Sequence, residues 1–242
     1  MHILVISDIH ANLTALEAVL NDAGDIDAAW CLGDLVGYGP DPNECIFRVR
    51  QLPKLICLLG NHDAAALGQI DLASFNPEAR RAVLWTQEAL NPGSIEYLRQ
   101  LPEREQVGSV TLAHGSPRQP VWEYLLDTRT ATQNFEHFTT PFCLVGHSHL
   151  PVVYHLGNGH TQAHLIMPQA QLPMEITPRA ILNPGSVGQP RDRDVRASYA
   201  IFDPDEQVWE LHRVEYDISS VQKRMEQAAL PRRHIQRLSA GW

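Results

Sequence analysis

Short apolar runs recur along the chain, and polar residues follow most of them at once. Five of these runs lie at 3–6, 29–32, 55–59, 110–113 and 142–145. Continuous runs of this length are typical of strands buried on both faces, as in the sheets of α/β proteins. Between the first two runs, Leu13, Leu16 and Leu20 recur at helical spacing. The pattern over residues 1–60 therefore predicts alternating strands and helices, the arrangement of parallel βαβ units.

Further helices are predicted where a capping residue precedes a helical pattern, often with proline at the first position. These helices cover 41–50, 77–90, 93–101 and 217–229, with Asp41, Asn76, Asn91 and Asp217 as their caps. The second and third form a helical insert at about 63–102, which we expect to cover one side of a functional site. The basic tail 231–242 has no clear pattern, so both a docked and a frayed tail remain open.

From Val107 onward, short β-type runs dominate. Besides those at 110–113 and 142–145, they lie at 152–156, 161–166, 180–182, 198–202 and 208–214. Gly157-Asn158-Gly159 has the chemistry of a hairpin turn. We expect these runs to form a second, largely antiparallel sheet. Two mixed sheets flanked by helices predict an α/β protein, a four-layer αββα sandwich, with residues 1–242 as a single domain.

Composition narrows the partners and the compartment. The net charge of −9 over 242 residues opposes binding to a nucleic-acid polymer, which relies on clustered Lys and Arg. Three of the four cysteines lie within apolar runs, where cysteine behaves as a small hydrophobe. The chain opens on a strand pattern, so we expect no secretory leader, and no apolar stretch reaches membrane-spanning length. We expect a cytoplasmic protein without a membrane partner, and homo-oligomer formation remains open.

Candidate ligands for metal ions follow five of the apolar runs, and they are Asp8, His10, Asp34, Asn61, His114, His147 and His149. In α/β sheets, ligands collect beyond the carboxyl ends of the strands. Carboxylate, imidazole and amide groups suit divalent ions such as Mn²⁺, Zn²⁺, Fe²⁺ and Ni²⁺. One zinc ion usually takes four ligands. Seven candidates therefore suit a pair of ions, and a carboxylate that bridges both ions is expected.

The motifs D-x-H, G-D, G-N-H-D, H-G and G-H-S-H, in this order over about residues 1 to 200, resemble those of the calcineurin-like metallophosphoesterase family. The segment 183–191 further resembles a bacterial branch of small phosphodiesterases within that family. The resemblance implies a ligand set of Asp8, His10 and His149 for one divalent ion, Asn61, His114 and His147 for the other, and Asp34 between them. Manganese is favoured, while iron, nickel, zinc and magnesium remain open.

The expected activity is hydrolysis of small phosphodiesters or phosphomonoesters, with metal-bound hydroxide attacking phosphorus in line. His62 is not needed as a ligand and is therefore free to protonate the leaving oxygen, with Asp63 orienting its ring. The alternative is that His62 is a surface residue. Arg191 follows a rigid loop rich in Gly and Pro. It either pairs with a phosphate oxygen of the substrate or belongs to a solvated run of charges.

Other interpretations remain open beside this one. A dinucleoside polyphosphate hydrolase or a protein phosphatase would have the same fold, whereas a noncatalytic scaffold would be favoured by loss of His62, which is present. Asn12 is expected to be an ordinary helix cap. Asn183 would fix a metal-site ligand, and Ser116, Arg118 and Trp122 either line the pocket or serve the core and surface. The histidines expected to be ordinary core or surface residues are His2, His137, His155, His160, His164, His212 and His234.

Overall fold

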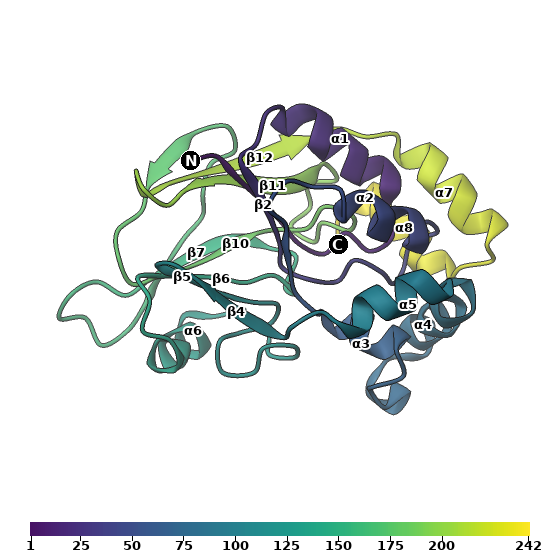
Figure 1. Cartoon of the computed structure of the whole chain (residues 1–242), viewed down its shortest axis with the longest axis horizontal. Coiled ribbons are helices and arrows are strands. Elements are labelled where there is room, and N and C mark those ends of the chain that lie inside the picture. Colours follow the sequence, from purple (N-terminus) through teal and green to yellow (C-terminus); the bar gives the residue numbers. More distant parts are fainter.

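The structure is a computed structural model that describes residues 1–242, except for the side chain of Ser74. Two six-stranded sheets lie face to face, and helices cover their outer sides (Figure 1). The predicted four-layer αββα sandwich is confirmed. In the described part of the chain, none of the helices is both long enough and apolar enough to span a membrane.

The first sheet contains, in spatial order, β3 (Ile56–Cys57), β2 (Ala28–Cys31), β1 (Ile3–Ile6), β11 (Ala197–Asp203), β12 (Val208–Val214) and β9 (Pro173–Glu175). β1 runs parallel to β2 and antiparallel to β11, so the sheet is mixed. The expectation that all strands after Val107 belong to the second sheet was wrong. β11 joins the first sheet instead, because Leu4 of β1 pairs with Ile201.

The second sheet contains, in spatial order, β4 (Arg104–Val107), β5 (Val110–Ala113), β6 (Phe142–Leu144), β10 (Ala180–Pro184), β7 (Pro151–His155) and β8 (His164–Ile166). Its three central strands, β5, β6 and β10, are parallel, so the sheet is mixed rather than largely antiparallel. β7 and β8 form the predicted hairpin, with His155 opposite His164. The second strand of this hairpin begins at His164 rather than at residue 161.

The helices are α1 (Leu13–Ala23), α2 (Pro42–Val49), α3 (Asn61–Ala66), α4 (Pro77–Ala89), α5 (Pro92–Arg99), α6 (Thr128–Asn134), α7 (Ile218–Gln227) and α8 (Arg232–Ala240), with short 3-10 turns η1 (Leu72–Ser74) and η2 (Phe135–His137). Asn12 caps α1 as predicted, because its side chain accepts a hydrogen bond from the Ala15 N–H. The basic tail is not frayed: most of it forms α8.

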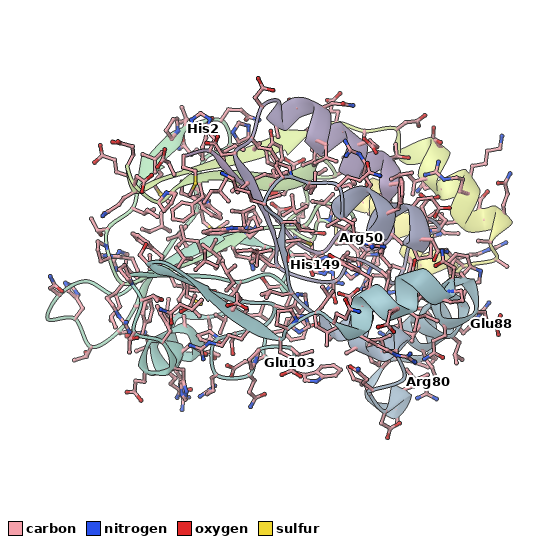
Figure 2. The ribbon with its side chains drawn as sticks, viewed as in Figure 1. His2, Arg50, Arg80, Glu88, Glu103 and His149 are labelled. Atoms are coloured by element: carbon pink, nitrogen blue, oxygen red, sulfur yellow. The ribbon has the colours of Figure 1, made fainter. Side chains whose placement is uncertain are left out.

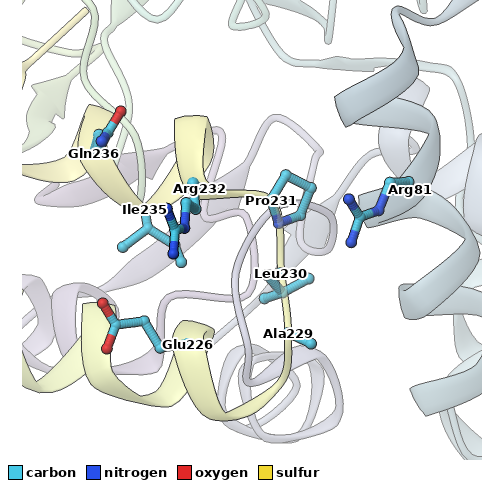
Figure 3. Close-up of a pocket in the computed structure, with 8 residues that line it drawn as sticks. All are labelled: Arg81, Glu226, Ala229, Leu230, Pro231, Arg232, Ile235 and Gln236. Atoms are coloured by element: carbon cyan, nitrogen blue, oxygen red, sulfur yellow. The ribbon is translucent and has the colours of Figure 1, made fainter.

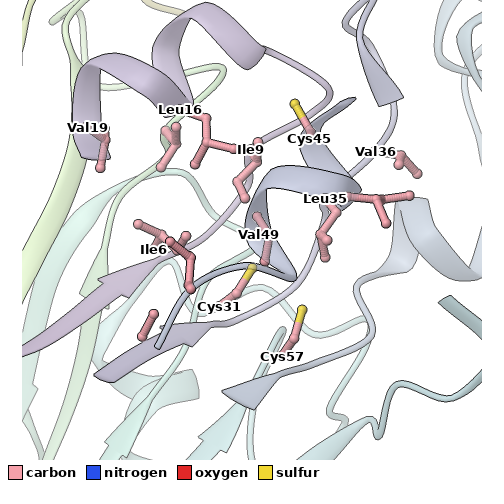
Figure 4. Close-up of a cluster of buried hydrophobic side chains, with 14 of the residues drawn as sticks. Ile6, Ile9, Leu16, Val19, Cys31, Leu35, Val36, Cys45, Val49 and Cys57 are labelled. Carbon is pink, nitrogen blue, oxygen red and sulfur yellow. The ribbon is translucent and has the colours of Figure 1, made fainter. Parts of the chain in front are cut away.

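The core divides along the faces of the first strand, because successive side chains of a strand point to opposite sides of the sheet. Ile3 and Val5 of β1 pack between the two sheets. Leu4 and Ile6 pack on the outer side against α1 and α2 (Figure 4). The cysteines of this outer cluster are free and buried, as expected for small hydrophobes.

A separate apolar cluster fixes the C-terminal helices. Val221 and Met225 of α7 and Leu238 of α8 pack with Ala82 of α4 and with the ring of Tyr38. The three helices border an open hollow, in which Arg81 extends from α4 toward Pro231 (Figure 3). The packing therefore brings α8 against the loop after β2 that carries Tyr38.

Candidate metal centre

The polar residues after five strands converge at one place in the molecule. His149, one of these residues, lies near the centre of the view in Figure 2. All seven candidate ligands are buried. Five of them adopt positive φ angles of 49° to 63°, namely Asp8, His10, Asp34, His147 and His149. Such backbone is strained for residues other than glycine and is concentrated at functional sites. The strained turns aim these side chains inward from the strand ends.

The two carboxylates of the cluster are held in the same way. One oxygen of Asp8 accepts from the His147 N–H at 3.0 Å, and one oxygen of Asp34 accepts from the His62 N–H at 2.8 Å. The other oxygens, Asp8 Oδ1 and Asp34 Oδ2, are buried and have no hydrogen-bond partner among the described residues. A buried anionic oxygen without a partner carries a large desolvation penalty. Both oxygens therefore fit a site for cations.

Four histidine rings are fixed by backbone carbonyls. Each donates one ring N–H: His10 to Val36 O at 3.1 Å, His114 to Leu32 O at 3.0 Å, His149 to Gln189 O at 2.6 Å and His147 to Trp122 O at 3.2 Å. A carbonyl can only accept, so these contacts fix the tautomer and leave the other nitrogen of each ring as an acceptor. Backing of this kind is usual for histidines that bind metals.

The free ring nitrogens and the carboxylate oxygens lie close together. The Nε2 atoms of His10 and His149 face each other at 3.1 Å, and Asp8 Oδ1 lies 3.2 Å from His149 Nε2. Two lone pairs that face each other repel unless a cation lies between them. This contact is a second observation that fits a metal ion.

Asp34 lies between this group and a second one. Its Oδ2 is 3.7 Å from His10 Nε2 and 3.4 Å from His114 Nε2. In the second group, Asn61 Oδ1 lies 3.1 Å from His114 Nε2, and the ligand atoms of Asp34, His114 and His147 lie within 4.8 Å of one another. The arrangement has the donors for two neighbouring ions and a carboxylate between them.

Burial sets the protonation of most of these rings. It lowers the pKa of His10 and His149, and it lowers the pKa of His147 to about 3. These imidazoles are therefore neutral at neutral pH, the form that binds metals. At His114 burial acts in the same direction, but the charge and hydrogen bond of Asp34, together with the charges of Asp8 and Asp63, outweigh it and raise the pKa to about 9. A proton on His114 thus compensates the Asp34 carboxylate where a metal ion would otherwise do so.

His62 is buried beside the cluster, and its ring lies 5.0 Å from that of His10, centroid to centroid. Its Nδ1 has no hydrogen-bond partner among the described residues. Burial lowers the pKa of His62 to about 4 against the opposing charge of Asp34. Asp63, expected to orient this ring, is engaged elsewhere: its two oxygens accept from the N–H groups of Gly60 at 3.0 Å and Val36 at 3.1 Å. Asp63 therefore fixes the turn that carries Asn61 and His62.

Glycine is required at position 60 because Asp34 lies too close for a side chain, and not because of the backbone angles. A Cβ atom on Gly60 would lie 2.1 Å from Asp34 Oδ1 and 2.3 Å from Asp34 N. Asn183 braces the turn after β6, because its amide donates to Gly146 O at 2.7 Å and to Ser148 Oγ at 3.0 Å. The expected role of Asn183 in fixing a ligand-bearing segment agrees with these contacts.

Arg191 stands apart from the charged residues around it. Its neighbours Asp192 and Asp194 pair with Arg213 and Arg196, respectively. The Arg191 guanidinium lies 6.0 Å from the centroid of the Tyr38 ring and donates to Gln189 Oε1 at 3.1 Å. Arg191 therefore faces the site, and the neighbouring charges form pairs among themselves.

Two aromatic residues of the site were missed by the sequence reasoning. Tyr38 contacts the rings of His10 and His62, at 4.6 Å and 4.3 Å between centroids. Tyr124 stacks on His147 at 3.8 Å. No motif surrounds either tyrosine, so no sequence signal was available to find them.

Two side chains of the loop that precedes Tyr124 hold the loop together. Ser116 Oγ donates to Glu123 at 2.7 Å, and Arg118 forms an ion pair with the same carboxylate. Both side chains therefore brace the loop after β5. The Trp122 side chain is 40% exposed, while its carbonyl backs His147.

The chain is similar to proteins of one family along its whole length. Residues 1–207 match the model of the calcineurin-like phosphoesterase superfamily domain. An uncharacterized protein of Methanocaldococcus jannaschii is 38% identical over 246 residues, covering 99% of this chain and 98% of the relative. The crystal structure of a metallophosphoesterase from Sphaerobacter thermophilus superposes with a TM-score of 0.92 at 49% identity, covering 100% of this chain and 99% of that one. A hypothetical protein from Pyrococcus horikoshii shares the fold, with a TM-score of 0.81 at 22% identity and coverage of 100% and 98%.

Proposed function

The chain belongs to the calcineurin-like phosphoesterase superfamily, and from this premise we propose that it hydrolyses small phosphodiesters or phosphomonoesters at a dinuclear metal centre. The observation that carries the proposal is the pair of buried carboxylate oxygens, Asp8 Oδ1 and Asp34 Oδ2, which lack a hydrogen-bond partner. Removing one partner of a buried ionic pair typically destabilises a protein by about 3 to 5 kcal/mol. Two such oxygens, surrounded by three neutral imidazoles and the His114 ring, therefore suit a site that cations complete.

The ligands fall into two sets that share one carboxylate. Asp8, His10 and His149 would hold one ion, Asn61, His114 and His147 would hold the other, and Asp34 would contact both. When bound, two divalent ions neutralise phosphoryl oxygens and lower the pKa of a water molecule to near neutrality. The chain itself fixes the ligands through carbonyls and strained turns, so little reorganisation is needed when the site fills.

His62 is the proposed general acid for the leaving oxygen. Its Nδ1 lies against the turn at Gly37, where a Cβ atom would come within 2.7 Å of it, which leaves Nε2 for the substrate. The pKa of about 4 leaves the ring neutral; burial and next the charge of Arg191 lower this pKa, while the charge of Asp34 opposes them. A bound phosphate ester adds negative charge beside the ring, which raises the pKa toward the range of an effective proton donor.

Arg191 is the proposed substrate-binding residue. Its guanidinium is half-buried, faces the site and is free of the ion pairs that its neighbours form. A guanidinium presents two parallel N–H donors that match two oxygens of a phosphate. This contact would be made equally in the ground state and in the transition state, so it would serve binding more than the chemical step.

A metal-supplemented turnover screen tests the proposal. The purified chain is stripped of metal, reloaded separately with Mn²⁺, Fe²⁺, Ni²⁺, Zn²⁺ or Mg²⁺, and assayed on bis(p-nitrophenyl) phosphate, phosphomonoesters, cyclic nucleotides and dinucleoside polyphosphates. We expect turnover that rises with metal and is suppressed by a chelator. Two bound ions without turnover on any ester would favour the noncatalytic scaffold instead.

A further inference from the structure

α8 (Arg232–Ala240) brings His234 to Tyr38, at the edge of the metal-ligand cluster. His234 and Arg237 lie three positions apart and therefore on one face of the helix. The ring of His234 lies 4.4 Å from that of Tyr38, which in turn contacts His62 at 4.3 Å. A single aromatic ring thus connects α8 to the candidate general acid.

The end of α8 is held against the loop that carries Arg191. The Arg193 N–H donates to Gly241 O at 2.7 Å, and Gly241 N–H donates to Arg237 O at 2.9 Å. The guanidinium of Arg237 also lies 5.6 Å from the centroid of the Trp242 ring. A contact with a ring face leaves the in-plane N–H donors of a guanidinium free. The end of α8 is therefore fixed to the Arg191 loop, and Arg237 lies one turn after His234 on the same face of the helix.

These basic groups have unused hydrogen-bond donors. Among the described residues, the buried Nε atoms of Arg191 and Arg237 have no partner, and neither does either ring nitrogen of the buried His234. Arg213 and Arg224, by contrast, pair with Asp192 and Asp41. Burial, and next the charge of Arg191, lowers the pKa of Arg237. The carboxylate of Glu78 only partly offsets the repulsion between Arg237 and Arg191, and an anion bound between the two guanidinium groups would offset it further.

We propose that Arg191 and Arg237 form an anion subsite beside the metal-ligand cluster, with Tyr38 and His234 beneath them, which binds a second phosphoryl group of the substrate. The proposal rests on the proposed phosphoesterase function and narrows its substrate to compounds with two or more phosphoryl groups. A phosphodiester carries one negative charge, which the two metal ions would already offset. Two additional guanidinium groups suit an anion of higher charge, as polyphosphate esters are.

The subsite is tested first by binding, without turnover. The probe is inorganic pyrophosphate, titrated calorimetrically into the metal-stripped protein. We expect Arg237→Ala to weaken pyrophosphate binding by about tenfold or more, and Arg237→Lys to retain part of the affinity, because a point charge replaces a fork of donors. The matched control is Arg232→Ala, which removes the same charge from the exposed side of α8 that borders the open hollow (Figure 3). It should change the affinity less than twofold.

Equal affinities of Arg237→Ala and Arg232→Ala, or no binding by the unaltered protein, would overturn the subsite. Thermal unfolding of each variant checks that α8 remains folded, and Arg237→Lys keeps the test valid if the alanine variant unfolds. A kinetic comparison then separates the two proposals. We expect Arg237→Ala to raise KM for a dinucleoside polyphosphate but not for bis(p-nitrophenyl) phosphate. Absent turnover on both substrates would count against the proposed function, while the pyrophosphate titration would still decide the subsite.

Discussion

The ligand cluster and the arginine pair lie side by side, but the chain builds them by different means. Every candidate ligand follows a buried strand or opens the helix behind it, so local turns aim it at the centre. The proposed arginine subsite instead depends on a loop and a C-terminal helix, which are joined by a backbone hydrogen bond and by packing of the helix on Tyr38. In the ligand cluster the same local feature, a polar residue directly after a buried strand, occurs five times. The arginine subsite depends on contacts between segments that are distant from the strand ends.

This difference teaches which property each region controls. The cluster contains two buried carboxylate oxygens without a hydrogen-bond partner, which suit metal ions, so changes there should alter metal content. The arginine side presents donors toward the approach to the cluster, so changes there should alter substrate affinity while the metals stay bound. A ligand variant that changed only substrate affinity, or an arginine variant that lost metal, would contradict this division.

Asp34→Asn should have the largest effect. A neutral amide cannot balance two cations, so we expect the variant to lose at least one ion and nearly all turnover. The metal-free variant should not gain stability, because the proton on His114 compensates the Asp34 carboxylate there and the substitution removes the anionic partner of that ring. Metal analysis and thermal unfolding in chelator measure the two effects. Two bound ions with unchanged turnover would exclude Asp34 as the bridge.

Asp63→Asn provides the contrast to this variant. Both Asp63 oxygens accept from backbone N–H groups, so the substitution should weaken the turn and lower stability by about 1 kcal/mol. The ions should remain bound. Loss of an ion in Asp34→Asn and retention of both ions in Asp63→Asn would distinguish a ligand carboxylate from a structural one at nearly the same depth.

His62→Ala should have the next largest effect. We expect kcat to fall by about 10² to 10⁴, as for the loss of a general acid, while both ions stay bound. An ester with a good leaving group needs little protonation and should lose less. The measurement is therefore the fall in kcat on a p-nitrophenyl ester compared with the fall in kcat on an alkyl ester. Equal losses on both would assign His62 to another role.

Arg191→Ala should act on binding. We expect KM to rise by about tenfold with a smaller change in kcat, and metal content to stay the same, because the contact is shared by the ground and transition states. Arg191→Lys should restore part of the loss. The control is Arg193→Ala, whose side chain is exposed two positions away. Matching kinetics in the two alanine variants would return Arg191 to an ordinary surface role.

The sequence predicted strands that carry an apolar pattern in their own residues, but it did not predict which strands pair across long distances in the chain. The strand at 3–6 and the hairpin around Gly157 were found because their residues carry the pattern themselves. The partners of β11 could not be found, because the pairing of Leu4 with Ile201 joins segments almost two hundred positions apart. β4 was missed for a different reason: Arg104, Glu105 and Gln106 are exposed and show no apolar alternation.

The same division holds for the candidate site. The sequence proposed all seven ligand residues, and the structure brings them together, because each lies at a strand end where turns decide its direction. Tyr38 and His234 were not proposed. His234 was expected to be an ordinary core or surface histidine, and it is indeed buried, but its ring lies against Tyr38 beside the cluster. Only the docking of α8 reveals this placement.

The last expected effect is confined to stability at acidic pH and arises from His234. Burial, and next the charge of Arg237, lowers the pKa of His234 from 6.5 to about 3. Between these two values the unfolded chain binds a proton that the folded chain does not, so this residue lowers the unfolding free energy as the pH falls below 6.5. It makes no such contribution at neutral pH and above, where both states are neutral.

His234→Phe should therefore reduce the acid sensitivity of the protein. The phenyl ring can keep the aromatic contact with Tyr38 and cannot be protonated. We expect the difference in unfolding free energy between variant and original to grow by up to about 1.4 kcal/mol for each pH unit between 6 and 4. Denaturant unfolding at several pH values measures this slope, and His160→Phe, at an exposed histidine of the β7–β8 loop, is the control. Parallel stability curves for His234→Phe and the original would show that α8 opens to water in solution, which would also weaken its role beside the cluster.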